Sequence, residues 1–103
     1  MVDLDPIRGH EQGGRRPALV LSIDAFNGGP AGLVVALPIT SRIRPMLVHV
    51  LIQAGEAGLP NDSVVLCEQV RVLSQERCAR RVGQVSLAVM AEVESRVRMI
   101  LGL

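Results

Sequence analysis

The apolar residues of this chain gather in short runs separated by glycine, proline and polar turns, and this spacing restricts the fold more than any other feature. A run of about four to eight apolar residues between turn signals is typical of a buried strand, whereas a helix needs a longer stretch with a period of about 3.6 residues. The runs that predict strands cover residues 2–4, 17–23, 32–39, 46–52, 63–73 and 82–85.

A helical pattern occurs at the C-terminal end of the chain. Ser86 is a suitable N-cap, and Gly102 can end a helix in the left-handed conformation. Between them, apolar residues recur at helical spacing: Leu87, Met90, Val93, Val97, Ile100 and Leu101. Short strands followed by one helix predict a single domain over residues 1–103 that is mainly β with α. We expect a small, strongly bent antiparallel sheet or barrel with a C-terminal helix.

The composition narrows the kinds of ligand that the chain can bind. Phe26 is the only aromatic residue, so a module that stacks several bases on aromatic rings is not expected. All 11 basic residues are arginine, and the net charge is only +1. Because the guanidinium pairs with phosphate or carboxylate through a planar fork, these arginines could bind an anion locally if they converge in space, and a codon or lineage bias is the alternative explanation.

Neither metal chemistry nor membrane insertion is indicated. His10 and His49 lie far apart, and no set of His, Cys, Asp and Glu has the spacing of metal ligands, so we expect no metal and no other cofactor. Cys67 and Cys78 are interpreted as reduced thiols. The N-terminus has no signal-peptide pattern, and no apolar stretch reaches the roughly 20 residues of a membrane span, which predicts a cytoplasmic protein.

The densest group of chemically active side chains lies in residues 9–17, which hold an imidazole, a carboxylate, an amide and two guanidiniums. The glycines of this segment let the backbone approach a ligand closely. Arg16 precedes Pro17, which favours an extended conformation at the start of a strand and so a rigid mount for a catalytic side chain. A polar hairpin loop with internal ion pairs is the alternative interpretation.

A second candidate group directly follows the strand expected at residues 32–39. Thr40, Ser41 and Arg42 supply two hydroxyls and a guanidinium that can bind a phosphate oxygen. Ordinary polar residues that end a strand are the alternative.

The third group, Glu68 and Gln69, lies inside the strand expected at residues 63–73. A charged group in an apolar strand must be paired, exposed at an edge or functional. Glu68 is expected to share a face with Leu66, where burial would pair it with an arginine. A purely structural ion pair is the alternative.

Together these groups suit the cleavage of an RNA strand. The substrate supplies the 2′-OH as the nucleophile, so the protein needs only to position the phosphate and stabilise the added negative charge. A Ser-His-Asp hydrolase is not expected because the chain has no nucleophile elbow.

Several blocks of the sequence closely resemble the MazF/PemK (Kid-like) family of toxin–antitoxin endoribonucleases. The G-x-E-Q-x-G-x-R-P motif in residues 9–17 is the specific one, and the other blocks follow in family order at residues 2–6, 18–21, 37–41 and 62–71 and in the terminal helix. The resemblance implies an SH3-like barrel with a C-terminal helix, usually a homodimer. It also implies metal-free cleavage of single-stranded RNA to 2′,3′-cyclic phosphate and 5′-OH ends, blocked by an acidic MazE-like antitoxin.

The resemblance also assigns roles to residues. Arg16 matches the family's catalytic arginine and Thr40 its catalytic threonine, while His10 and Glu68 match positions of RNA contact or proton transfer. The remaining residues expected to bind RNA are Glu11, Gln12, Gly13, Gly14, Arg15, Ser41, Arg42, Gln69 and Arg71.

Two departures from the family pattern leave other functions open. Family members usually begin with Gly-Asp-Ile-Val-Trp or similar, so we expect a truncated first strand here, and Glu68 replaces the commoner aspartate. The alternatives are therefore a non-catalytic, gyrase-binding toxin of the CcdB type and an inactive homologue with a truncated first strand.

Overall fold

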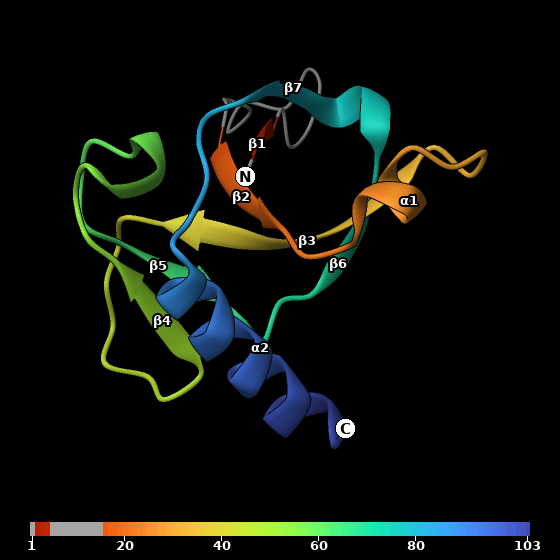
Figure 1. Cartoon of the computed structure of the whole chain (residues 1–103). Helices are drawn as coiled ribbons and strands as arrows, with labels where there is room; N and C mark the ends of the chain where they lie inside the picture. Colours follow the sequence, from red (N-terminus) through yellow and green to blue (C-terminus); the bar gives the residue numbers. More distant parts are fainter. Residues whose placement is uncertain (1, 5–15) are drawn as a thin grey trace.

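The computed structural model describes residues 2–4 and 16–103. Within this part, strands dominate and one long helix closes the chain (Figure 1). The elements are β1 (Val2–Leu4), β2 (Arg16–Val20), α1 (Asp24–Asn27), β3 (Leu33–Thr40), β4 (His49–Ile52), the 3-10 turn η1 (Glu56–Gly58), β5 (Ser63–Leu66), β6 (Arg71–Ser74), the 3-10 turn η2 (Gln75–Arg77), β7 (Cys78–Arg81) and α2 (Leu87–Leu101).

The sheet is antiparallel and is organised around β3, its longest described strand. The strand order is β4-β5-β3-β2-β1-β7, and β6 pairs with β3 as well. One edge of β3 pairs with β2, and the other pairs with β6 over Leu33 to Ala36 and with β5 at Ile39 and Thr40. The expected class, a bent antiparallel sheet with a C-terminal helix, is confirmed, although the ladders of the described strands do not close into a barrel.

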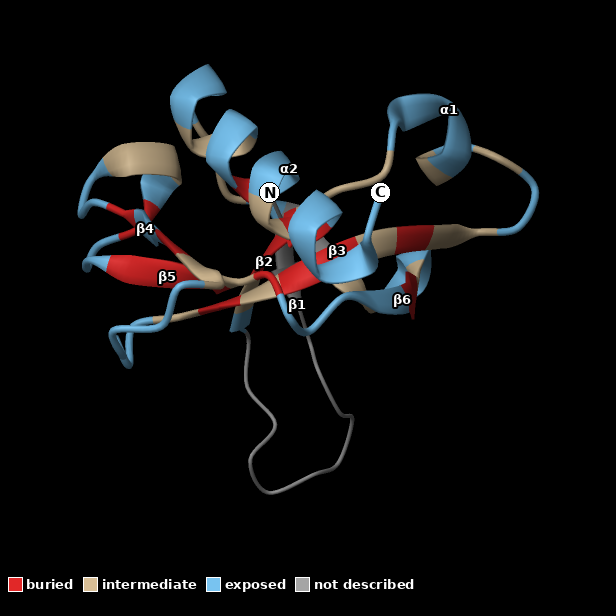
Figure 2. Cartoon of the chain, turned by 90° about the horizontal axis from the view of Figure 1, so that it is seen from below, coloured by how far each residue is buried: buried red, intermediate tan, exposed pale blue. Residues whose placement is uncertain are grey.

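The core lies between this sheet and α2. Val93 and Val97 of α2 pack in one cluster with buried side chains of the strands, among them Leu19, Leu37 and Val65. Figure 2 shows α2 lying over one side of the sheet, with buried segments of β3 and β5 beneath it. Burial of this apolar surface is the main contribution that holds the helix on the sheet.

The ends of α2 are those that the sequence predicts. The Ser86 hydroxyl accepts a hydrogen bond from the Val89 amide at 3.1 Å, and Gly102 adopts φ 71° as the C-terminal cap. The expected apolar stripe is buried only at its centre, since Leu87 and Leu101 at its ends are exposed. No described helix has both the length and the apolar character required to cross a membrane.

The expected strand at residues 63–73 is wrong, because the structure divides it into β5 and β6. β5 continues its register with β3 so that Leu66 falls level with Pro38, whereas Arg71 pairs with Ala36. The intervening residues 67–70 stand against the single Leu37 and bulge out as a turn, closed by a 3.0 Å bond from the Gln69 amide to the Leu66 carbonyl.

The remaining differences lie at strand ends. The last strand is β7 (Cys78–Arg81), before the run expected at residues 82–85, and β4 begins at His49 instead of residue 46. β1 has three residues, and it pairs with both β2 and β7, so it still joins these strands.

The core predicts a large difference between two matched substitutions. Leu37 is fully buried and Leu87 is 89% exposed. We expect Leu37→Ala to lower the free energy of unfolding by about 2–5 kcal/mol, because it leaves a cavity under α2. Leu87→Ala should change it by less than about 0.5 kcal/mol. Urea unfolding at one protein concentration measures both, and equal losses would contradict the assigned core.

Candidate functional site

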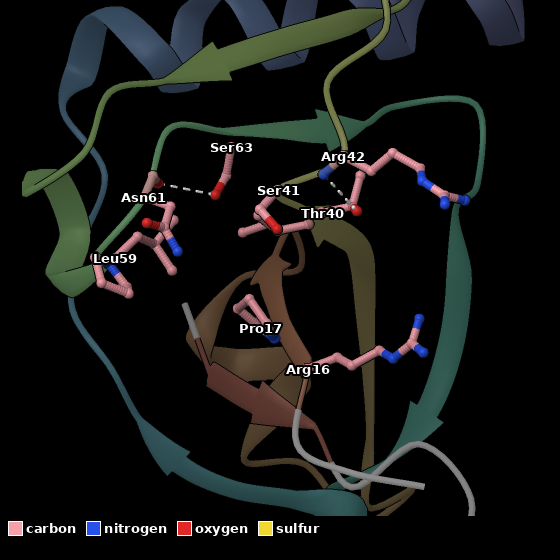
Figure 3. A pocket seen from close by; sticks show the side chains of 10 residues that line it. Arg16, Pro17, Thr40, Ser41, Arg42, Leu59, Asn61 and Ser63 are labelled. Atoms are coloured by element: carbon pink, nitrogen blue, oxygen red, sulfur yellow. Dashed lines mark hydrogen bonds between the residues drawn. The ribbon is translucent and has the colours of Figure 1, made fainter. Parts of the chain in front are cut away.

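A cavity of about 480 Å³ lies where β2 begins and β3 ends, next to the loop that precedes β5. It brings together Arg16 with Thr40, Ser41 and Arg42, two groups that are far apart in the sequence (Figure 3). The lining residues are Arg16, Pro17, Ile39, Thr40, Ser41, Arg42, Leu59, Pro60, Asn61 and Ser63.

The register of β2 with β3 explains why Arg16 and Thr40 meet. Ala18 pairs with Pro38, and in antiparallel strands two further steps along each strand bring Arg16 level with Thr40. Two steps also keep each residue on the face that it shares with Ala18 or Pro38. The register of β2 with β3 therefore places Arg16 opposite Thr40.

The Thr40 hydroxyl is held in one orientation. Its oxygen accepts a hydrogen bond from the Arg42 amide at 3.1 Å. Because a hydroxyl that accepts one bond keeps its own hydrogen to donate, Thr40 can donate to an anion in the cavity.

Two arginines line the same cavity as this hydroxyl. In Figure 3 the side chains of Arg16 and Arg42 both extend to the same side of the cavity. Neither guanidinium makes a hydrogen bond or an ion pair with any residue that the structure describes. Two unpaired forks and an oriented hydroxyl form a site suited to a phosphate group.

Glu68 does not line this cavity. It lies in the turn between β5 and β6, and its carboxylate is 3.1 Å from Nε2 of His49. The partner is therefore a histidine and not the expected arginine, and the expected place of Glu68 on the Leu66 face of a strand is wrong. The His49 side chain is only 5% exposed, and its Nδ1 has no partner among the described residues.

The surroundings of Glu68 keep its carboxylate charged. Partial burial raises the pKa of Glu68, but this effect is outweighed by other contacts. Hydrogen bonds from the side chains of His49 and Gln69 and from its own amide, with the charge of His49, bring the pKa below its ordinary value. Glu68 is thus ionised at neutral pH and oriented by a buried imidazole.

The neighbouring Cys67 offers no nucleophile. Its thiol is buried, and burial, followed by the charge of Glu68, raises its pKa to about 11 against an opposing effect of Arg96. The thiol stays protonated at neutral pH, so it contributes packing and not thiolate chemistry.

The other expected site residues fall into two groups. Gln69 lies in the exposed turn, and Arg71 is the exposed first residue of β6, and neither lines the cavity. The positions outside the described residues are His10, Glu11, Gln12, Gly13, Gly14 and Arg15.

One wall of the cavity was not foreseen from the sequence. It consists of the uncharged residues Leu59, Pro60, Asn61 and Ser63, of which the middle pair indicated only a turn. The pairing of Val64 with Thr40 brings the residues just before β5 next to the end of β3. The sequence alone does not show this pairing, so it gave no signal for this wall.

Comparisons with known proteins give one consistent picture. A family model described as PemK-like, MazF-like toxin of type II toxin-antitoxin system matches residues 1–101. Endoribonuclease MazF9 of Mycobacterium tuberculosis is 36% identical over 107 residues, which cover 99% of this chain and 91% of that protein. A crystal structure of MazF from Deinococcus radiodurans has a TM-score of 0.82 at 41% identity, covering 99% of this chain and 92% of that one. A MazE-MazF structure from the same organism has a TM-score of 0.83 at 36% identity, covering 99% and 90%.

The lowered pKa of Glu68 predicts a pH-dependent contribution to stability. A carboxylate with a depressed pKa stabilises the fold above its unfolded pKa, about 4.5, and this contribution is lost as the pH falls through the lower folded value. We expect Glu68→Gln to lower the urea midpoint at about pH 7, and the difference from wild type to shrink below about pH 4. Glu92→Gln on exposed α2 is the control. A difference that is the same at both pH values would contradict this contribution.

Proposed function

We propose a function for a chain that belongs to the family of PemK-like, MazF-like toxins of type II toxin–antitoxin systems. The protein is an endoribonuclease that cuts single-stranded RNA at specific sequences without a metal ion, leaving 2′,3′-cyclic phosphate and 5′-OH ends. Cleavage of mRNA in the cytoplasm would inhibit translation and growth. The observation that carries this proposal is the cavity lined by Thr40, Arg16 and Arg42, in which neither guanidinium is paired with a described residue and the Thr40 hydroxyl accepts a bond from the Arg42 amide.

The cavity supports a mechanism based on charge stabilisation. The scissile phosphate binds with its oxygens against Arg16 and the Thr40 hydroxyl. The 2′-oxygen attacks the phosphorus after losing its proton, and the bond to the 5′-oxygen breaks as that oxygen gains one. The pentavalent transition state carries more negative charge than the ground state, so Arg16 and Thr40 stabilise it preferentially.

The proton transfers need a second group, because a guanidinium with a pKa above about 12 is a poor acid. His10 and Glu68 are the proposed candidates for the general base. Glu68 is charged at neutral pH and oriented by His49, but it is not among the residues that line the cavity. This placement favours His10 as the group that acts on the 2′-OH, with Glu68 contacting RNA further along the strand.

RNA contacts are also proposed for residues around the cavity. Ser41 and Arg42 line it and would bind the phosphates next to the scissile one. Gln69 and Arg71 are exposed close to Glu68 in the chain, and they are proposed to contact RNA outside the cavity. Glu11 to Arg15 lead directly into Arg16 in the sequence and complete the proposed set.

The proposed protein partners are a MazE-like antitoxin and a second copy of the chain. The Deinococcus radiodurans relative was solved as MazE-MazF. Large apolar side chains are exposed in β4 and the segment before it and at the end of α2, and such surfaces are commonly buried by partners. They are Ile43, Met46, Leu47, Leu51, Met99 and Leu101.

Removal of the Arg16 guanidinium should abolish most of the activity. Labelled single-stranded RNA is incubated with the protein in EDTA, and the ends of the products are identified. We expect Arg16→Ala to cut about 100- to 1000-fold more slowly, because it loses a charge-stabilising donor. Arg98→Ala, on α2 outside the cavity, is the control and should match wild type. An Arg16→Ala protein that folds normally and cuts at the wild-type rate would contradict the proposed role of Arg16 in cleavage.

The same assay separates the alternatives. RNA left intact by the wild type, together with stalled gyrase, would favour the CcdB-type toxin. RNA left intact with no effect on gyrase would favour an inactive homologue.

The hydroxyl of Thr40 can be tested with two substitutions of similar size. Thr40→Val keeps the shape of the side chain but removes its hydroxyl. That hydroxyl accepts a hydrogen bond from the Arg42 amide and is proposed to donate one to the phosphate. We expect a loss of about 100-fold or more for Thr40→Val and less than about tenfold for Thr40→Ser, which keeps a hydroxyl. Single-turnover rates at saturating enzyme measure the chemical step. A Thr40→Val protein that cuts at the wild-type rate would contradict a role for the hydroxyl.

A further inference from the structure

The cavity has two chemically different halves. On one side lie the guanidiniums of Arg16 and Arg42, and on the other, beyond Ser41, lie Leu59, Asn61 and Ser63 (Figure 3). The second half is the uncharged wall (Leu59, Pro60, Asn61 and Ser63). A phosphate group binds to the charged half and fills only part of a volume of about 480 Å³. The uncharged wall is therefore available to another part of the same nucleotide strand.

The backbone of the uncharged wall is fixed on both sides of Asn61. The Ser63 hydroxyl donates to the Asn61 carbonyl at 3.0 Å. The Asp62 carboxylate accepts a bond from the Ala54 amide at 2.7 Å, which turns its charge away from the lining. On the other side, the Gly55 amide donates to the Leu59 carbonyl at 2.7 Å, and the Leu59 side chain is buried in the core.

The segment that carries this wall also packs against residues 82–86, which precede α2. A Cβ at Gly58 would lie 2.6 Å from the Val82 carbonyl, and one at Gly83 would lie 2.5 Å from the Ala57 carbonyl. The Glu56 carboxylate accepts a bond from the Ser86 amide at 3.1 Å. The two glycines allow the segments to approach closely and the Glu56–Ser86 bond joins them, so Asn61 is presented on a well-supported loop.

The side chain of Asn61 is exposed and makes no hydrogen bond with any described residue, although Ser63 bonds its backbone carbonyl. Its amide presents a donor and an acceptor side by side, which matches the paired groups on the edge of a nucleobase. An asparagine pairs best with adenine, through N6 and N7. The exposed ring of Pro60 next to it offers an apolar surface for a base plane.

We propose that Asn61 reads one nucleobase beside the scissile phosphate, with adenine preferred, and that the uncharged wall is the subsite that binds this base. The inference rests on the proposed function, since it needs the phosphate to occupy the charged half of the cavity. Sequence-specific recognition of single-stranded RNA uses such amide contacts with the edges of unstacked bases. Asn61 is a specificity-determining residue and takes no part in the chemical step.

The test uses a random-sequence single-stranded RNA library and sequences the ends produced by cleavage. Wild type, Asn61→Ala, Asn61→Asp and Gln53→Ala are compared, and Gln53 is the control because it is exposed near the same segment but does not line the cavity. Urea midpoints check that all four fold alike.

In Asn61→Ala we expect the preference for one nucleobase over the others to weaken by about 5- to 150-fold at one position of the cleavage profile. That factor is the discrimination typical of a bidentate base contact. Asn61→Asp replaces the donor by a second acceptor, so the preference at that position should move from adenine toward cytosine, whose N4 amine donates. Cleavage of the whole library should fall less than about tenfold in both variants, because Arg16 and Thr40 still hold the phosphate.

Two outcomes overturn the inference in distinguishable ways. If wild type cuts, Arg16→Ala does not, and both Asn61 variants keep the wild-type profile, then the base subsite is wrong and the proposed function stands. If the wild type cuts no RNA, both the proposed function and the base subsite are wrong.

Discussion

The shared use of β3 by three other strands is the constraint on which the rest of the molecule depends. On one edge, its pairing with β2 brings Arg16 level with Thr40. On the other edge, its pairing with β5 brings the segment before Ser63 to the same end of the strand. The two walls of the cavity are therefore set by two ladders on one strand. That strand is held by its own buried residues, among them Leu37 and Ile39.

The same strand also explains why Glu68 lies apart from Arg16. β5 and β6 follow one edge of β3 in the same direction, but residues 67–70 stand against a single residue and must bulge outward. The bulge carries Glu68 toward β4, where the buried His49 binds it. A carboxylate inside the cavity would neutralise a guanidinium that the proposed mechanism needs free, so this separation keeps the phosphate site cationic.

The sequence predicts local structure better than it predicts the site. The caps of α2 follow from Ser86 and Gly102, because capping depends on adjacent residues. The bulge at residues 67–70 could not be predicted, since mainly apolar segments lie on both sides of it and only the register with β3 divides them into two strands. Asn61 was missed for the same reason, because its place opposite Arg16 depends on strand pairing and not on its neighbours in the chain.

The two halves of the cavity are supported by different parts of the fold, and this division has a functional consequence. The charged half stands at the start of β2 and the end of β3, two strands whose buried residues Leu19, Leu37 and Ile39 belong to the core. The uncharged wall stands on a loop that contacts the sheet through Leu59 and the start of α2 through Glu56. Substitutions in that loop would alter the proposed base contact while the proposed phosphate site keeps its geometry. A fold built in this way can change the sequences that it cuts without rebuilding the residues proposed to cut them.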